Sequence, residues 1–265
     1  MEILVCVKRV PMVGGKIVVT ADGQDVDTRM SGFTVSPHEE CAVEEAVRLV
    51  ERHGGSVTVL TLGPPAAADQ LRDMLALGAS RAVLLETDGR EWGPIATAEA
   101  IVAAVRSRAD LLDGEAPGAP GCPYDLLLFG NEAADTGDYQ VGVRVAHALG
   151  LPCVTGIKNL EVTVGASGQA RREYGGSEEI FDLRLPAVIS VKEGINLPRY
   201  PSLPGRLRAK RAAIERSVPE WHPEGLRKER LRVPAGETKG AQILGTGADA
   251  VPALVALLDD LGVLS

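Results

Sequence analysis

Residues 130–142, GNEAADTGDYQVG, combine glycines, acids and small polar side chains directly after the apolar run YDLLLF. In an open α/β sheet, ligands bind beyond the carboxyl ends of the strands, which is where this stretch would lie. The helix expected to begin at YQVGVRVAHALG would offer unpaired N–H groups and the positive end of its dipole. Gly137 and Gly142 would let phosphate oxygens approach the backbone. The stretch predicts an anion-binding loop; the alternative is a plain loop in which Asp135 and Asp138 cap the helix.

Residues at the ends of other predicted strands are expected at the same edge of the sheet. Cys6 closes the first strand and is followed by Lys8 and Arg9, Leu62 closes the second strand, and residues 36–39 open a helix beside them. Backbone groups here could hold an adenine base while helix N-termini hold a phosphate. Lys8 or Arg9 could pair with that phosphate or remain solvated. Together these positions predict a site for an adenine nucleotide.

The chain carries no recognisable catalytic or metal-binding motif. The acidic stretch has neither a Walker lysine nor G-x-G-x-x-G, and no G-x-S-x-G occurs. None of the four histidines lies in a nucleophile or metal pattern, and His147, on a predicted helix, is interpreted as structural. The four cysteines form no C-x-x-C pair. The sequence therefore indicates a binder or carrier and not a self-sufficient enzyme.

Composition narrows the class of protein. The 265-residue chain is 45% hydrophobic, enough for the core of one large domain or one domain with appendages. Its net charge of -8 argues against a nucleic-acid-binding surface, which needs an excess of Lys and Arg. The N-terminus lacks a basic leader, and no apolar stretch approaches the length of a membrane span. We expect a cytoplasmic protein with reduced cysteines, without nucleic-acid partners or membrane insertion.

The elements that must position these residues alternate between strand and helix through the first 150 residues. This order predicts a doubly wound α/β sheet with mainly parallel strands. The strongest helix signal begins at Ser36, which precedes Pro37 and Glu39 in a capping-box pattern, and it ends at Gly54. Strands are expected at 3–7, 56–64, 81–87, 124–130 and 185–195, further helices at 65–79, 93–109 and 139–150, short strands within 151–176, and a hairpin at 14–26.

The regular pattern is lost after Asn196. Residues 196–226 hold five prolines and many basic side chains, which predicts an extended arm and not part of the core. An amphipathic helix is expected near 249–264. We therefore divide the chain into an α/β domain, residues 1–195, and an arm, residues 196–265. Ordering such an arm costs conformational entropy, which contacts with a partner would offset.

Four segments resemble, in this order, the beta (small) subunit of electron transfer flavoprotein: VCVKRVP, SPHEECAVEEAVRL, GNEAADTGDYQVG and LPAVISVKEGINLPRYPSLPGRLRAK. The resemblance implies an adenine-nucleotide-binding, Rossmann-like domain paired with an alpha subunit whose mobile domain carries FAD. The arm would embrace that alpha subunit. The heterodimer would carry electrons from acyl-CoA or other dehydrogenases, as in fatty acid oxidation, to a quinone-linked acceptor. The flavin would supply the redox chemistry, so this chain would not itself be an enzyme.

The resemblance also implies roles for particular residues around the predicted sheet edge. Residues 136–147 would wrap the phosphate, and Leu62 would line the adenine. Ser36 stands where the family usually has Asn, so only a hydroxyl is left to bond the base. The implied nucleotide-binding set is Cys6, Ser36, Pro37, His38, Glu39, Leu62, Asp135, Thr136, Gly137, Asp138, Tyr139, Gln140, Val141 and Gly142.

Contacts with other proteins are implied elsewhere in the chain. Glu173 falls on a family glutamate that reaches towards the flavin domain, and its alternative is an ordinary surface charge. Val13 stands where ordinary members can have a tyrosine near the flavin ring. The segment PSLPGRLRAKR matches a recognition loop that docks acyl-CoA dehydrogenases, with Leu203 as its apolar anchor and Arg208 and Arg211 beside it.

The residues leave the identity of the nucleotide open. AMP with a structural role is the preferred ligand, and a second FAD in the same pocket, as in electron-bifurcating members, is the alternative. The form DTGDYQVG resembles the one common among bifurcating members. A stand-alone nucleotide-binding regulator of the same fold would not explain the long basic arm. A hydrolase or ligase of this fold class would need an S-G-G-x-D type motif, which is missing.

Overall fold

The computed structural model describes residues 1–12, 17–111, 121–163, 167–225, 228–234 and 241–264. Its centre is a seven-stranded sheet in the order β12-β5-β4-β1-β6-β11-β7, and every pairing in it is parallel. The strands are β1 (Glu2–Cys6), β4 (Ser56–Gly63), β5 (Arg81–Glu86), β6 (Leu126–Gly130), β7 (Cys153–Ile157), β11 (Ala187–Val191) and β12 (Glu215–Ser217). The predicted doubly wound, mainly parallel α/β fold is confirmed.

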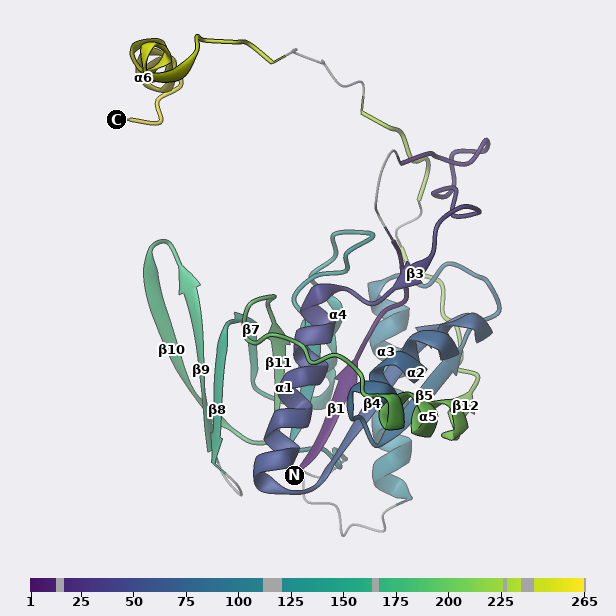
Figure 1. Ribbon diagram of the computed structural model, residues 1–265. Coiled ribbons are helices and arrows are strands. Elements are labelled where there is room, and N and C mark those ends of the chain that lie inside the picture. The colour runs from purple at the N-terminus through teal and green to yellow at the C-terminus, as the bar shows by residue number, and fades with distance from the viewer. Residues whose placement is uncertain (13–16, 112–120, 164–166, 226–227, 235–240, 265) are drawn as a thin grey trace.

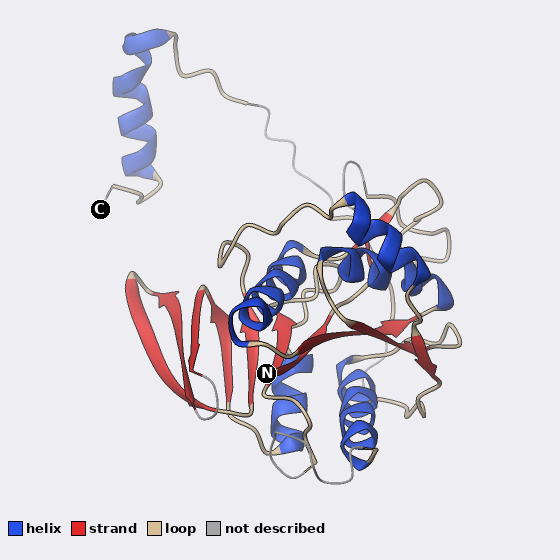
Figure 2. Cartoon of the chain, turned by 60° about the horizontal axis from the view of Figure 1, so that its bottom comes forward, coloured by secondary structure: helices blue, strands red, loops and turns tan. Residues whose placement is uncertain are grey.

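Helices cover both faces of this sheet (Figure 2). One face carries α1 (Pro37–His53) and α2 (Ala68–Leu77), the latter preceded by the short η1 (Pro65–Ala67); the other carries α3 (Pro94–Asp110) and α4 (Val141–Leu149). Side chains of β1 alternate between the faces, because successive residues of a strand point in opposite directions. Ile3 and Val5 pack towards α1 and α2, whereas Leu4 and Cys6 pack towards α3 and α4.

The sequence signals at the ends of α1 are confirmed. Ser36 is the N-cap, its hydroxyl accepts a hydrogen bond from the amide of Glu39, and the Glu39 carboxylate bonds back to the Ser36 amide. Pro37 occupies the first turn, where its missing N–H costs nothing. Gly54, at φ 75°, ends the helix in a conformation that other residues rarely adopt. The capping box fixes where the helix begins at the carboxyl edge of the sheet.

A separate antiparallel sheet stands beside the main one (Figure 1). It consists of β8 (Asn159–Thr163), β9 (Ser167–Tyr174) and β10 (Ser177–Arg184), and the last two pair along eight residues. A two-stranded ladder joins β2 (Val10–Pro11) to β3 (Phe33–Thr34). In the described part of the expected hairpin at 14–26, the pairing is a single bridge between Val19 and Val26. Backbone hydrogen bonds from the amide of Thr20 to the carbonyl of Asp25 and from the amide of Asp27 to the carbonyl of Val18, both 2.8 Å, flank this bridge around the turn at Asp22-Gly23. The hairpin prediction is therefore confirmed for its described part, and residues 13–16 lie outside the described ranges.

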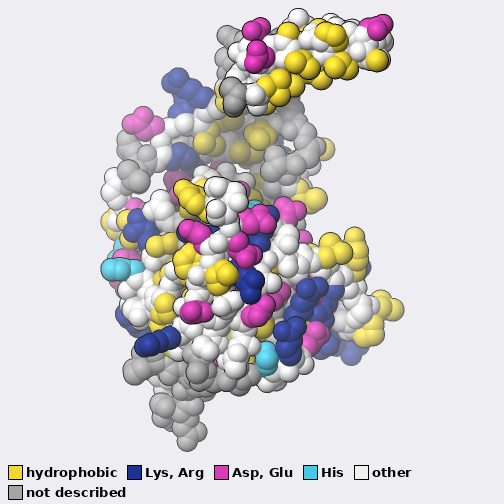
Figure 3. Space-filling view, turned by 90° about the vertical axis from the view of Figure 1, so that its left-hand side faces the viewer, with side chains coloured by type: hydrophobic (Ala, Val, Ile, Leu, Met, Phe, Trp, Pro, Cys, Tyr) yellow, Lys and Arg dark blue, Asp and Glu magenta, His cyan; other side chains and the backbone are white. Residues whose placement is uncertain are grey.

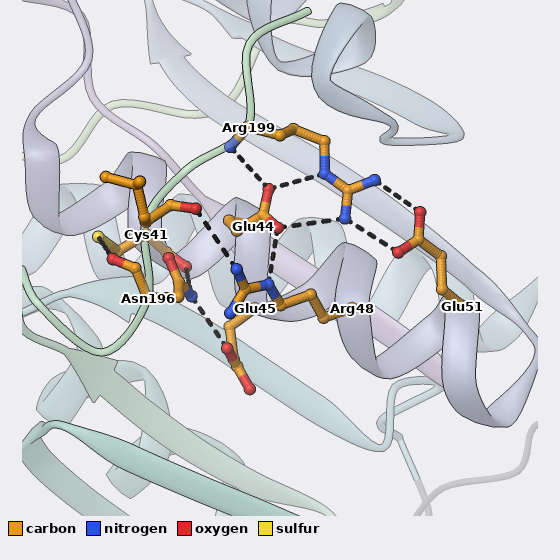
Figure 4. A network of polar contacts seen from close by, with 8 residues as sticks. Cys41, Glu44, Glu45, Arg48, Glu51, Asn196 and Arg199 are labelled. Carbon is orange, nitrogen blue, oxygen red and sulfur yellow. Dashed lines mark hydrogen bonds and ion pairs between the residues drawn. The ribbon is translucent and has the colours of Figure 1, made fainter.

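The expectation of an irregular chain after Asn196 was wrong for its first part. Helix α5 (Leu203–Arg211) packs against α2 through the small buried residues Gly205 and Ala209, and β12 extends the main sheet by pairing with β5. Arg199 reaches back to α1 and bonds the buried carboxylate of Glu44 (Figure 4). Residues 196–217 thus belong to the folded domain. The role of residues 196–265 in holding another subunit stays a prediction.

The last described helix is different. Helix α6 (Val251–Asp260), which follows the short η2 (Gly247–Ala250), lies apart from the main body in Figure 1. None of its residues is buried, and Val251, Leu254 and Val255 are among its exposed apolar side chains. Figure 3 shows apolar side chains gathered along this helix, the separate body at the top of the view. The predicted amphipathic helix therefore exists, and nothing in the described part of the chain covers its apolar face.

Candidate functional site

A cavity of about 950 Å³ lies at the carboxyl end of the main sheet. Its size is at the upper end of the range for pockets that bind small molecules. Strand ends from β1, β4 and β6 and the starts of α3 and α4 contribute to its walls. The position agrees with the general rule that open α/β sheets bind ligands beyond the carboxyl ends of their strands.

The interior of this cavity is apolar. Leu60, Phe129, Val188 and Ile101 line it together with the thiol of Cys6, and all five are buried. Burial raises the pKa of Cys6 above its ordinary value, so this thiol is neutral and packs as a small apolar group. Such a surface suits the face of a planar ring, because the ring loses its contact with water when it binds there.

The acidic residues of the segment 130–142 stabilise the loop between β6 and α4. The carboxylate of Asp135 accepts from Lys8 Nζ at 2.6 Å and from the Thr136 amide at 2.9 Å. The carbonyl of Asp138 accepts from the amide of Ala133 at 2.9 Å, so the loop closes on itself. Neither acid caps the helix that follows, because the N-cap of α4 is Gln140. The alternative prediction, in which Asp135 and Asp138 act as caps, was wrong.

The start of α4 presents backbone donors to the cavity. No described side chain caps it, and the first bond inside the helix runs from the amide of Arg144 to the carbonyl of Gln140 at 2.9 Å. The amides of residues 141–143, which line the cavity, precede that bond and have no acceptor within the helix. Gly142 packs against Phe129, where a Cβ would lie 3.2 Å from the ring. These amides and the helix dipole favour an anionic group.

Glu39 brings a buried carboxylate to the cavity wall. One oxygen accepts from the amide of Lys8 at 3.0 Å and the other from the amide of Ser36 at 3.2 Å. Burial raises the pKa of Glu39 to about 7, although both hydrogen bonds act to lower it. Gly130 is needed beside it, since a Cβ there would lie 2.7 Å from Glu39 Cγ. The capping box thus ties the first strand to α1 directly below the cavity.

The structure brings most of the predicted nucleotide-binding residues to one cavity. Cys6, Glu39 and Leu62 line it on one side, and Thr136 and residues 138–142 line it on the other. The remaining predicted residues do not line it. Ser36 is buried as the N-cap of α1. The Nδ1 of His38 accepts a hydrogen bond from the amide of Glu193 at 3.4 Å. Pro37, Asp135 and Gly137 also lie outside the lining.

Sequence reasoning missed the tryptophans. Trp92, just before α3, and Trp221, far along the chain, are the only two tryptophans, and both line the cavity. The indole N–H of Trp221 donates to the carbonyl of Glu91 at 3.0 Å. The indole N–H of Trp92 is buried and meets no acceptor among the described residues. A signal existed in the sequence, because both tryptophans stand in the pattern Glu-Trp-x-Pro.

The two basic residues after β1 are engaged within the chain. Lys8 pairs with Asp135 at 2.6 Å, and the Arg9 guanidinium lies 3.2 Å from the centre of the Phe33 ring. Both line the cavity. Pairing of either one with a ligand phosphate therefore stays a prediction, and for Lys8 it would require exchange of its present partner.

The residues predicted to meet other proteins are exposed. Glu173 lies on β9, 3.5 Å from Lys158 Nζ, with 75% of its side chain exposed. Leu203 begins α5 after its N-cap Ser202 and is 73% exposed. Arg208 and Arg211 lie on the same helix. Val13 falls outside the described residues, so the consequence of its replacing a tyrosine stays a prediction.

The described ranges contain neither a metal-binding cluster nor a membrane-spanning helix. No group of three or more His, Cys, Asp or Glu residues there could hold a metal ion. Within the same ranges, no helix is long and apolar enough to cross a membrane. The four cysteines are free thiols.

Fold and cavity define a doubly wound α/β protein with a cavity at the carboxyl edge of its sheet. A family model for the electron transfer flavoprotein domain matches residues 26–220. The chain is 34% identical to the electron transfer flavoprotein subunit beta of Bacillus subtilis, over 81% of this chain and 78% of the relative. It is 33% identical to that of Bradyrhizobium diazoefficiens, over 92% and 93%. The mitochondrial subunit beta of Oryza sativa is 36% identical over 83% of both chains.

The chain belongs to the electron transfer flavoprotein family and, within it, to the beta subunits. The resemblance predicted from four sequence segments is confirmed. Proteins of this family transfer electrons, and a beta subunit implies an alpha-subunit partner.

Proposed function

We propose that this chain is the beta subunit of a heterodimeric electron transfer flavoprotein and that its cavity holds AMP. Acyl-CoA or other dehydrogenases would deliver electrons to FAD on the alpha subunit, and the heterodimer would pass them to a quinone-linked acceptor. The observation that carries the proposal is the cavity itself, where an apolar interior meets the open amides of α4. The names of the relatives support the assignment to beta subunits.

The residues of the cavity fit an adenine nucleotide. A phosphate would be held by the amides of residues 141–143, which have no acceptor within α4. The adenine ring would lie against the apolar interior that includes Phe129 and Leu60. The buried N–H of Trp92, without an acceptor among the described residues, offers one further hydrogen bond to the ligand. The chain would thus bind and orient the nucleotide and exclude water from it.

The chain is proposed to supply no reacting group of its own. Flavin, when bound by the heterodimer, supplies the exchange of electrons. Cys6 is buried with a raised pKa, and the side chains of Glu39 and Lys8 are engaged by Ser36 and Asp135. The contribution of this chain would be to hold the nucleotide, to receive the flavin domain and to dock donors through the segment that begins at Leu203.

A second candidate is FAD in the same cavity, as in bifurcating members. The volume of about 950 Å³ favours it, because this space extends from the start of α4 to the two tryptophans. A stand-alone regulator is less favoured, because the apolar side chains of α6 have no cover within the described part of the chain. Exposed apolar faces of this kind mark protein interfaces.

Nucleotide release from the purified complex tests the proposal. The chain is coexpressed with its alpha subunit, the complex is denatured, and the released nucleotides are separated by chromatography and read by absorbance. We expect one AMP and one flavin per heterodimer. Two flavins per heterodimer would replace AMP with FAD. A lone, stable, flavin-free homodimer that ignores the alpha subunit would favour the regulator.

A further inference from the structure

One wall of the cavity comes from a short segment that follows β12. We call residues 218–225 the strap. Trp221, His222, Pro223 and Glu224 of the strap all line the cavity. The indole of Trp221 is held by the carbonyl of Glu91. The strap therefore returns from the far edge of the sheet to close the side of the cavity where α3 begins.

Glu224 is fixed on the start of α3. Its Oε1 accepts from the amide of Ala96 at 2.6 Å. The N-cap of α3 is Gly93, which has no side chain to satisfy the first amides of the helix. A Cβ on Gly93 would lie 2.3 Å from Glu224 Oε2, so the carboxylate fills the space that a capping side chain would take. Glu224 thus acts as an N-cap that comes from a distant part of the chain.

The starts of α3 and α4 therefore face the same cavity but differ in whether a carboxylate of this chain occupies their first amides. The start of α4 presents amides that no described side chain caps, whereas the start of α3 already holds the carboxylate of Glu224. The nearby cations are engaged as well: Arg90 lies 2.9 Å from Asp88, and Lys228 lies 3.5 Å from Glu91. A ligand anion is therefore favoured at α4 and repelled at α3.

We propose that Glu224 is a specificity-determining residue that limits this cavity to nucleotides with a single phosphate. Its carboxylate keeps the strap closed on α3 and removes that helix start as a site for a second phosphate group. The inference rests on the proposed function, because it takes an adenine nucleotide as the ligand. It predicts preference for AMP over ADP and over FAD, whose two phosphates need a second anionic subsite or tolerance of the carboxylate.

Two variants change the contact between Glu224 and the start of α3 from opposite sides. Glu224→Gln keeps the size and an acceptor oxygen but removes the charge. Gly93→Ala leaves the sequence of the strap unchanged, but the added methyl group displaces the carboxylate of Glu224. The backbone at residue 93 tolerates alanine, because its φ is -79°. Glu220→Ala is the control, since it removes one exposed negative charge from the same part of the chain.

The test uses the heterodimer, stripped of nucleotide, titrated with AMP, ADP and FAD. Binding is followed by calorimetry and, for AMP and ADP, by the fluorescence of the two cavity tryptophans. We expect both variants to lower the ratio of the ADP Kd to the AMP Kd by about tenfold, and Glu220→Ala to leave it unchanged. The ratio for FAD should move in the same direction.

The outcomes separate this inference from the proposed function. If wild type binds AMP and both variants, folded by circular dichroism, keep the wild-type ratios, Glu224 does not set specificity and the inference fails alone. Wild type that already binds ADP as tightly as AMP also overturns it. If wild type binds no adenine nucleotide, the proposed function fails together with the inference.

Discussion

Helix α1 carries two buried glutamates whose surroundings have opposite effects. Glu39, 7% exposed, receives hydrogen bonds from the backbone amides of Lys8 and Ser36, and burial raises its pKa to about 7. Glu44, 2% exposed, is held by Arg199 and Arg48. Burial acts to raise the pKa of Glu44, but the hydrogen bonds from these guanidinium groups outweigh it and lower the pKa.

The difference corresponds to two tasks on one helix. The compensated carboxylate, Glu44, fastens the segment after β11 to α1, and Arg199 also makes two bonds to Glu51 (Figure 4). The uncompensated carboxylate, Glu39, lies at the cavity. Carboxylates with raised pKa values cluster at functional sites, whereas well-paired ones more often serve structure. The comparison indicates that the carboxylate of Glu39, at the cavity, is less well compensated than that of Glu44.

The largest expected effect is the loss of the cation that holds Glu44. Arg199→Ala would leave a buried carboxylate with Arg48 as its remaining partner, and we expect a loss of about 3 kcal/mol in the free energy of unfolding. Urea unfolding of the full-length chain measures it. Arg52→Ala, an exposed arginine at the end of the same helix, is the control and should cost less than about 0.5 kcal/mol. Equal losses in the two variants would remove the distinction between the glutamates.

A smaller, pH-dependent effect is expected at Glu39. Its pKa is higher in the folded state than in the unfolded chain, so the folded state binds more protons between about pH 4.5 and pH 7, and stability falls as pH rises through that window. The fall should be on the order of 2 kcal/mol between about pH 5 and pH 8, and Glu39→Gln should abolish it. Unfolding at several pH values checks this, with the exposed Glu99→Gln as control.

Glu44 sharpens that measurement, because the sign is reversed. A lowered folded-state pKa gives stability that is present at neutral pH and lost as pH falls through the folded-state value. Glu44→Gln should therefore flatten the acid limb of the stability profile and Glu39→Gln the neutral limb. A profile in which both variants flatten the same limb would contradict the assignment of opposite surroundings.

The smallest effect on stability is expected at Leu203, in the segment that Arg199 fastens. This side chain is 73% exposed, so Leu203→Ala should change the free energy of unfolding by less than about 0.5 kcal/mol. If it anchors a donor dehydrogenase, the KM for that dehydrogenase should rise by about tenfold. Val218→Ala, an exposed aliphatic outside α5, should change neither quantity. An unchanged KM for Leu203→Ala would remove this residue from the docking surface.

Local signals made much of the fold predictable. The capping box at Ser36, the alternation of apolar strands and amphipathic helices, and the glycines at helix ends depend on neighbouring residues, and the structure contains them. The parallel sheet follows from that alternation. The cavity was predictable because the carboxyl ends of parallel strands must meet at one edge.

Other features depend on distant partners and left little trace in the sequence. Helix α5 packs through Gly205 and Ala209 and so lacks the apolar stripe that announces a buried helix. The cap of α3 comes from Glu224, far along the chain, where no local capping pattern could reveal it. Trp221 likewise reaches the cavity only through the path of the strap.

The short strand β12 has a consequence for where this chain can be cut. With only Glu215, Arg216 and Ser217, it shields the outer side of β5, which would otherwise show bare peptide groups to any passing strand. A fragment that ends before residue 215 would keep nearly the whole sheet but would expose the unpaired edge of β5. That edge could pair with the same edge of another copy. Fragments made for isolated study should therefore retain β12. Its three charged or polar residues protect the sheet edge against aggregation through strand pairing.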